Sequence, residues 1–126
     1  MSEPVDHLPP DSVTVACLCA EWCGTCREYR TVFEQAVEGQ RHAGVRGLWI
    51  DVEDESELVG AVDVDNFPTL LMARGGEVLF FGTITPHAST LARLVQAALD
   101  GQTHLGGEPP DADVRALAAR LQQVAG

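Results

Sequence analysis

Four cysteines have the clearest capacity for chemistry in this sequence. They lie within ten residues of one another, at Cys17, Cys19, Cys23 and Cys26. A structural disulfide framework would spread its cysteines along the chain to join distant parts. Cysteines grouped this closely favour redox chemistry or metal binding instead.

Cys23 and Cys26 have the C-x-x-C spacing, within the segment Trp22-Cys23-Gly24-Thr25-Cys26. The segment follows an apolar stretch and precedes a helical pattern. Unpaired N–H groups at the start of a helix stabilise an anion, so we expect the Cys23 thiol to have a lowered pKa and to be the nucleophile. Gly24 keeps the approach to it open. Cys26, one helical turn later, would resolve a mixed disulfide by attacking Cys23.

Other interpretations of the cysteines stay open. Cys17 and Cys19 lie two residues apart on a predicted strand, a spacing unsuited to a disulfide between them. We interpret them as small buried hydrophobic residues. Alternatively, all four cysteines bind zinc or an iron–sulfur cluster. A third possibility is an adaptor that binds partners while its thiols are incidental.

The elements that position the cysteines alternate between strand and helix patterns. Ser12–Cys19 and Val45–Val52 are short and apolar, which predicts buried strands. The stretches TLLMA and EVLFFG predict two more strands, joined at Arg74-Gly75-Gly76. Asp54 and Glu57 resemble a capping box for a short helix through Val62. Three longer apolar stripes predict helices, with the members Tyr29, Val32, Phe33, Ala36 and Val37; Leu91, Leu94, Val95, Ala98 and Leu99; and Val114, Leu117, Ala118, Leu121 and Val124.

The order of these elements is β-α-β-α-β-β-α followed by an additional helix. It predicts an α/β fold, with a central mixed sheet of about four strands flanked by helices. We divide the chain into a lead-in at 1–11, a domain at 12–100, and a linker with an extra helix at 101–126. Pro86 fits the first turn of the helix before the linker. The extra helix, at 111–125, packs either on the domain or on a partner, and Asp111 or Asp113 could cap it.

Composition excludes several classes of protein. A chain of 126 residues with 45% hydrophobic residues fits one globular domain. Its net charge of −11 argues against nucleic-acid binding. No apolar stretch approaches the roughly 20 residues that cross a bilayer, so we expect no membrane association. The first residues do not have the pattern of a signal peptide. We therefore expect a cytoplasmic protein, and a monomer.

Three segments carry a family resemblance. AEWCGTC resembles the active-site segment of thioredoxins, Phe67-Pro68-Thr69 resembles their cis-proline loop, and TLLMARGGEVLFFG resembles their terminal hairpin. The resemblance covers roughly residues 12–100 in a consistent order. It implies a thioredoxin fold.

The resemblance also implies a function, which is thiol–disulfide exchange with protein disulfide or dithiol substrates. The resemblance implies no cofactor beyond a redox-active Cys23–Cys26 disulfide. It also implies a reductase partner and a role in cell redox homeostasis. Pro68 would be cis beside the two cysteines and would hold the Phe67 backbone for pairing with an extended substrate segment. The implied substrate-binding residues are Trp22, Gly24, Thr25, Phe67, Pro68, Thr69 and Gly82.

Four positions depart from the family pattern. Cys17 stands where thioredoxins usually have a buried aspartate, and Gly47 stands where they have its lysine partner. Cys19 replaces an aromatic residue, and Thr25 replaces the proline of the motif. We therefore expect the usual proton relay to be absent, and the redox potential to be altered.

Overall fold

The computed structural model describes residues 12–20, 22–62, 64, 66–75, 77–103 and 105–123. The predicted lead-in at 1–11 and Gly76 of the predicted hairpin lie outside the described residues. The elements are, in order, β1 (Val13–Cys19), α1 (Gly24–Glu38), the 3-10 turn η1 (Arg41–Ala43), β2 (Val45–Asp51), α2 (Ser56–Val59), β3 (Thr69–Arg74), β4 (Glu77–Thr83), α3 (Ala88–Leu99) and α4 (Ala112–Leu121).

The four strands form one mixed sheet in the order β2-β1-β3-β4. β1 is parallel to β2 and antiparallel to β3, and β3 is antiparallel to β4. This arrangement confirms the predicted mixed sheet flanked by helices. β1 is therefore central, and all seven of its residues are buried. Burial on both faces explains why six of its seven residues are apolar, the exception being Thr14.

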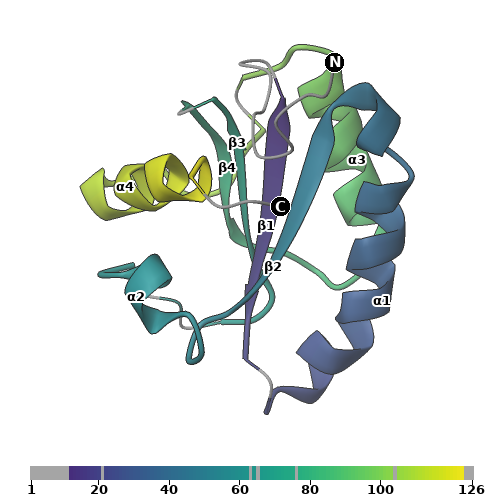
Figure 1. Cartoon of the computed structure of the whole chain (residues 1–126). Helices are drawn as coiled ribbons and strands as arrows, with labels where there is room; N and C mark the ends of the chain where they lie inside the picture. Colours follow the sequence, from purple (N-terminus) through teal and green to yellow (C-terminus); the bar gives the residue numbers. More distant parts are fainter. Residues whose placement is uncertain are drawn as a thin grey trace, which may run out of the picture.

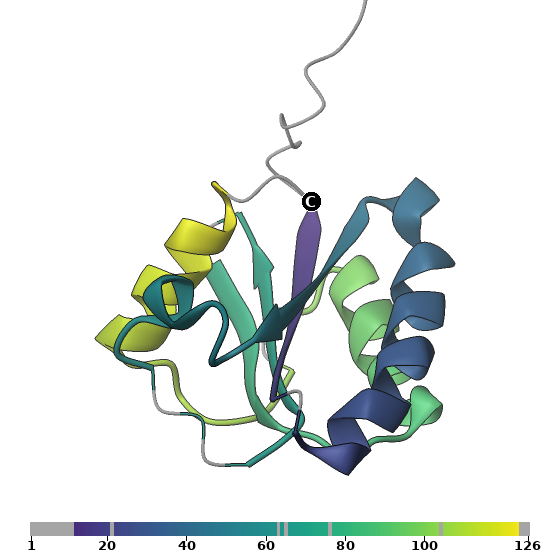
Figure 2. The same ribbon diagram turned by 60° about the horizontal axis from the view of Figure 1, so that its bottom comes forward.

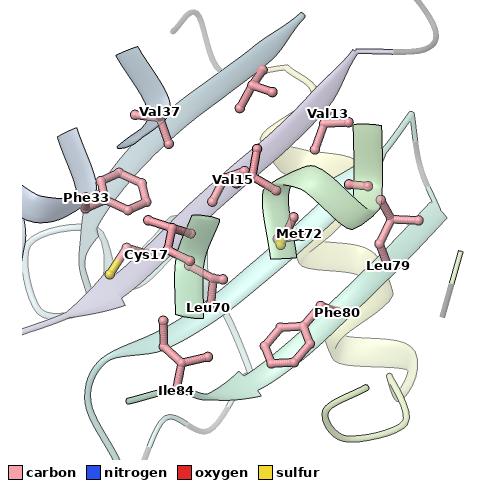
Figure 3. Close-up of a cluster of buried hydrophobic side chains, with 14 of the residues drawn as sticks. Val13, Val15, Cys17, Phe33, Val37, Leu70, Met72, Leu79, Phe80 and Ile84 are labelled. Atoms are coloured by element: carbon pink, nitrogen blue, oxygen red, sulfur yellow. The ribbon is translucent and has the colours of Figure 1, made fainter. Parts of the chain in front are cut away.

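Helices cover both faces of the sheet (Figure 1). α1 and α3 lie on one face, and α2 and α4 lie on the other, as the turned view in Figure 2 also shows. Because side chains alternate along a strand, β1 sends Val15, Cys17 and Cys19 into the core under α1 and α3. Figure 3 shows Cys17 in this core, together with Phe33 of α1. Ala16 and Leu18 enter the second core.

α4 completes that second core, which settles the question that the sequence left open. Leu117 and Leu121 are buried there against the sheet. The Asp111 carboxylate accepts a hydrogen bond from Val114 N at 2.9 Å and so caps the helix. Arg120 Nε donates to the Leu58 carbonyl at 2.8 Å, which ties α4 to α2.

Two local predictions about helix starts are wrong. Asp54 does not cap α2, which begins at Ser56 with no side-chain capping bond. The carboxylate of Asp51 stabilises the turn before α2 instead. It accepts hydrogen bonds from Glu53 N at 2.9 Å and Asp54 N at 3.0 Å. Pro86 precedes α3 rather than lying in its first turn, since the helix begins at Ala88.

The segment after α3 runs beside β4 rather than away from the domain. Leu105 N donates to the Leu79 carbonyl at 3.2 Å, and Glu108 N donates to the Phe81 carbonyl at 2.7 Å. Gly107 forms a parallel bridge with Phe81 and has a φ of +83°. A side chain at Gly107 would collide with the β4 backbone, so this close approach requires glycine.

None of the described helices is long and apolar enough to span a membrane.

Candidate functional site

Cys23 is the N-cap residue of α1, at the point where the chain leaves the sheet and enters the helix. Its backbone N–H donates to the Ala20 carbonyl at 3.0 Å, and its own carbonyl accepts from Arg27 N at 3.2 Å. The side chain makes no capping hydrogen bond. It is a free thiol, partly exposed, and it also packs against the buried cluster under α1. Cys23 is thus held by the backbone while the residue remains partly exposed.

Cys26 lies one turn further along α1 and is 1% exposed. It forms a disulfide with Cys19, with the two Cα atoms 5.8 Å apart. The expected Cys23–Cys26 disulfide is therefore not the one in this structure. The physical reason is direction: Cys19 faces α1 from the end of β1, and Cys26 faces the sheet from α1. Our interpretation of Cys19 as a merely hydrophobic residue is wrong.

Cys17 is the second free thiol, and it is fully buried. Its Sγ lies 3.8 Å from Cys19 Sγ, within hydrogen-bonding reach for sulfur. Burial raises the pKa of the Cys17 thiol. Burial also raises the pKa of Tyr29, and the electrostatic interaction with Cys17 raises that pKa further. The raised pKa favours the protonated form of Cys17 in the folded protein, which agrees with the interpretation of a small buried residue.

The Tyr29 hydroxyl belongs to the same interior region of α1. The residue is 1% exposed, and its oxygen has no hydrogen-bond partner among the described residues. Tyr29 therefore fills space beneath the cysteines rather than linking them to solvent.

An aromatic pair borders Cys23. Trp22 is 63% exposed, which makes it the large hydrophobic side chain most open to solvent among the described residues. Its ring stands edge-on to Phe67, with 5.7 Å between the ring centroids. Its Nε1 donates to Glu53 Oε2 at 3.2 Å, so the loop after β2 also holds the ring. Trp22 and Phe67 thus form an exposed apolar surface beside the free thiol.

The loop that carries Phe67 leads directly into β3. The Phe67–Pro68 peptide bond is cis. Pro68 is fully buried, and its carbonyl accepts from Ile84 N at 3.1 Å. Thr69 Oγ1 donates to the Asn66 carbonyl at 2.6 Å. These bonds fix the loop between the sheet and Trp22, where its backbone borders the aromatic surface.

The remaining predicted site residues differ in their surroundings. Gly24 and Thr25 are exposed at the start of α1, between Cys23 and Cys26. Gly82 is buried in β4, opposite Leu70. A side chain at Gly82 would meet Gly107, Glu108 and Phe80 rather than a cysteine.

A cavity of about 270 Å³ reaches Cys26 from the β2 side. Carboxylates and guanidinium groups surround it, and its lining residues are Ala20, Cys26, Arg27, Arg30, Trp49, Asp51, Asp54 and Glu55. Sequence reasoning did not connect the acidic residues Asp51, Asp54 and Glu55 with the cysteines. The signal was available, because parallel pairing sets Asp51 beside Cys19 at the same end of the sheet.

The four cysteines are not arranged around one point in this structure, as ligands of a single metal ion would be. Within the part of the chain that the structure describes, no group of three or more His, Cys, Asp or Glu side chains could hold a metal ion. Cys19 and Cys26 are bonded to each other, and Cys23 lies apart from Cys17 at the surface.

Comparisons with known proteins indicate the family of this chain. The sequence profile of the family described as Thioredoxin matches residues 5–97. A thioredoxin of Listeria monocytogenes is 35% identical over 60 residues, which are 48% of this chain and 57% of that protein. The chain spans about half the length of the curated relatives it matches.

Solved structures give the same result. The crystal structure of thioredoxin from Trypanosoma brucei brucei has a TM-score of 0.62 and 27% identity, covering 71% of this chain and 77% of that one. A mutant thioredoxin from Halobacterium salinarum has a TM-score of 0.60 and 26% identity, covering 76% of this chain and 79% of that one.

Proposed function

The chain belongs to the thioredoxin family, and on this basis we propose that it is a protein thiol–disulfide oxidoreductase in which Cys23 attacks and Cys26 resolves. One observation carries the proposal. A partly exposed free thiol begins a helix beside an exposed aromatic surface, and a buried cysteine that forms a disulfide lies one turn away. Family membership supports thiol–disulfide exchange in general, and the residue roles are our inference.

The reaction begins from the reduced protein. The Cys23 thiolate attacks one sulfur of a substrate disulfide, and the other substrate sulfur leaves as a thiolate. Cys26 then attacks Cys23 Sγ, which releases the second substrate sulfur and closes a Cys23–Cys26 disulfide. A reductase or a small dithiol returns the two electrons. Electrons pass only between sulfur atoms, so the reaction needs no cofactor.

Substrate binding is assigned to the surface beside Cys23. Trp22 and Phe67 supply apolar contact area, and the fixed Phe67–Pro68 loop offers backbone groups to an extended segment. Gly24 and Thr25 border the thiol without covering it, and Thr69 holds the loop through Asn66. Gly82 has no direct role in this proposal.

The cavity beside Cys26 supports a route for its proton. In this chain Cys17 occupies the position of the family's buried aspartate, so an internal carboxylate is not available there. Asp51, Asp54 and Glu55 line a cavity that Cys26 also lines. We assign to these carboxylates the removal of the Cys26 proton.

The cell context follows from the same chemistry. Four cysteines within ten residues suit a reducing compartment such as the cytoplasm better than an oxidising one. There, reduction of protein disulfides by this chain would contribute to redox homeostasis.

Reduction of insulin disulfides by dithiothreitol, followed as turbidity, tests the proposal. We expect the wild-type chain to accelerate the reaction, and Cys23→Ser to lose at least 100-fold of that rate. Cys17→Ala is the matched control and should keep it, because Cys17 is buried and protonated. Equal rates for wild type and Cys23→Ser would show that the thiols are incidental to function.

A further inference from the structure

Cys26 has two cysteine neighbours with different access to solvent. Cys19 is bonded to it from the end of β1, and both residues are 1% exposed. Cys23 precedes it by one turn of α1 and keeps a partly exposed thiol. The Cys23 side chain also packs against the cluster that contains Cys19 and Cys26. The Cys26 sulfur is therefore bonded to the buried Cys19, and the partly exposed Cys23 lies one helical turn away.

We propose that Cys19 is a third redox-active cysteine, and that Cys26 exchanges its disulfide between Cys23 at the surface and Cys19 in the interior. The proposal rests on the proposed function of Cys23 and Cys26. It adds a catalytic residue, because the Cys19 sulfur itself takes part in bond exchange.

The exchange balances without any external oxidant. Starting from the surface disulfide, the Cys19 thiolate attacks Cys26 Sγ, the Cys19–Cys26 bond forms and the Cys23–Cys26 bond breaks. Cys23 leaves as a thiolate and takes up the proton that Cys19 gave up. The number of disulfides is one before and after, so the step is an isomerisation. The reverse step restores the surface disulfide.

The Cys19–Cys26 form and the Cys23–Cys26 form differ in how they react with a substrate. With the interior disulfide, the protein is oxidised while Cys23 is still a thiol that can attack a substrate. Cys26 is then unavailable to resolve the mixed disulfide, so the substrate stays bound. A protein reductant has little direct access to the interior disulfide, since both of its residues are 1% exposed. The Cys23–Cys26 form therefore offers such a reductant the more accessible disulfide.

Cys17 is not part of the exchange, although its Sγ lies 3.8 Å from Cys19 Sγ. The two residues are on one strand, two positions apart, and side chains at that spacing stand roughly parallel. A disulfide between them would require backbone movement. Cys17 therefore supplies a matched control, buried on the same face of β1 as Cys19.

Disulfide mapping of the Cys23→Ser variant is the decisive experiment. The reduced variant is oxidised with trans-4,5-dihydroxy-1,2-dithiane, unfolded, alkylated with N-ethylmaleimide and analysed by peptide mass spectrometry. It has three cysteines, and we expect one alkylated cysteine, Cys17, with a Cys19–Cys26 linkage. Cys23 lies at the surface, so this variant should fold, and circular dichroism checks that it does.

The same mapping is applied to wild type and to two further variants. Oxidised wild type and Cys17→Ala should each contain both linkages, Cys19–Cys26 and Cys23–Cys26. Cys19→Ala should contain Cys23–Cys26 alone. In the folded oxidised state, alkylation of Cys23 should therefore be at least tenfold slower in Cys19→Ala than in Cys17→Ala.

Several results would overturn the proposal. They are three alkylated cysteines in oxidised Cys23→Ser, a linkage that includes Cys17, or a single linkage in wild type. Mapping uses no protein substrate, so it is independent of the insulin assay. Loss of the proposed function would appear as wild-type inactivity toward insulin with both linkages still present.

Discussion

Cys19 and Cys26 join the end of β1 to the first turn of α1, with Cα atoms 5.8 Å apart and a sequence separation of seven. Closing even a short loop lowers the entropy of the unfolded chain. The oxidised protein should therefore be more stable than the reduced protein by about 2 kcal/mol. Urea unfolding with and without a phosphine reductant measures this difference.

Two variants control for that measurement. Cys26→Ala removes the partner of both possible disulfides and should abolish the difference between the oxidised and reduced proteins. Cys17→Ala should retain it. Identical unfolding midpoints for oxidised and reduced wild type would contradict the prediction.

Replacing Trp22 with alanine should weaken binding of protein substrates without unfolding the domain. The ring is 63% exposed, so we expect the free energy of unfolding to change by less than about 0.5 kcal/mol. KM for insulin should rise severalfold, while the rate with a small aromatic disulfide stays unchanged. Steady-state kinetics with both substrates measures the two effects.

The other tryptophan supplies the control. Trp49 is half-buried and lies edge-on to Phe33, with 5.6 Å between the ring centroids. Trp49→Ala should lower stability by more than about 1 kcal/mol. An equal loss of stability in the two variants would show that Trp22 is a structural residue.

Burial of Cys17 makes the reduced protein sensitive to alkaline pH. The thiol has an ordinary pKa of 9.0, and burial raises its pKa in the folded state. Below pH 9 both states keep the proton and stability is full. Above it, the unfolded chain loses the proton while the folded chain keeps it, so the free energy of unfolding falls by up to about 1.4 kcal/mol per pH unit.

Urea unfolding of the fully reduced protein between pH 8 and pH 10 measures this slope. Cys17→Ala removes the titrating group, so its slope should be shallower than that of wild type. Parallel curves would mean that Cys17 ionises in the folded protein as easily as in the unfolded chain.

Gly47 should tolerate no side chain while Val37 is present. A Cβ at Gly47 would lie 2.5 Å from Val37 Cγ2. Gly47→Ala should therefore cost about 1–3 kcal/mol through overpacking. In a Val37→Ala background the cost should fall to less than half, and a double-mutant cycle from thermal or urea unfolding measures this coupling. Additive effects would show that the two residues do not meet.

Removing the Leu117 side chain should destabilise the whole domain. Leu117 is fully buried in the core that α4 and the sheet share. We expect Leu117→Ala to cost about 2–5 kcal/mol. Ala116→Ser, on the exposed side of the same helix, should change stability by less than about 0.5 kcal/mol. If the two variants unfold at the same urea concentration, α4 is not part of the cooperative unit.

Most of the architecture could be predicted from local pattern. β1 is apolar except at Thr14 because helices cover both of its faces, and the chain enters α1 at the C-x-x-C segment. Asp111 is a recognisable cap. The start of α2 was less predictable, because Asp51 at the end of β2 competes with Asp54 for the same turn.

Some parts of the candidate site could also be predicted from the sequence, and others could not. Cys23, Trp22 and the Phe67–Pro68 loop are recognisable from motifs, since each motif is a short contiguous segment. The cavity beside Cys26 is not, because its residues come from α1, from β2 and from the loops that follow β1 and β2.

By itself, the sequence determined the order of the elements, the mixed sheet and the position of Cys23 at the start of a helix. These features depend on residue patterns that repeat over a few positions. Only the tertiary structure decided that α4 covers the second face of the sheet, and that Cys26 is bonded to Cys19. Both depend on which side chains face one another across elements that are separate in the chain. Cys26 is bonded to Cys19 because the face of β1 that carries Cys19 is turned toward the face of α1 that carries Cys26.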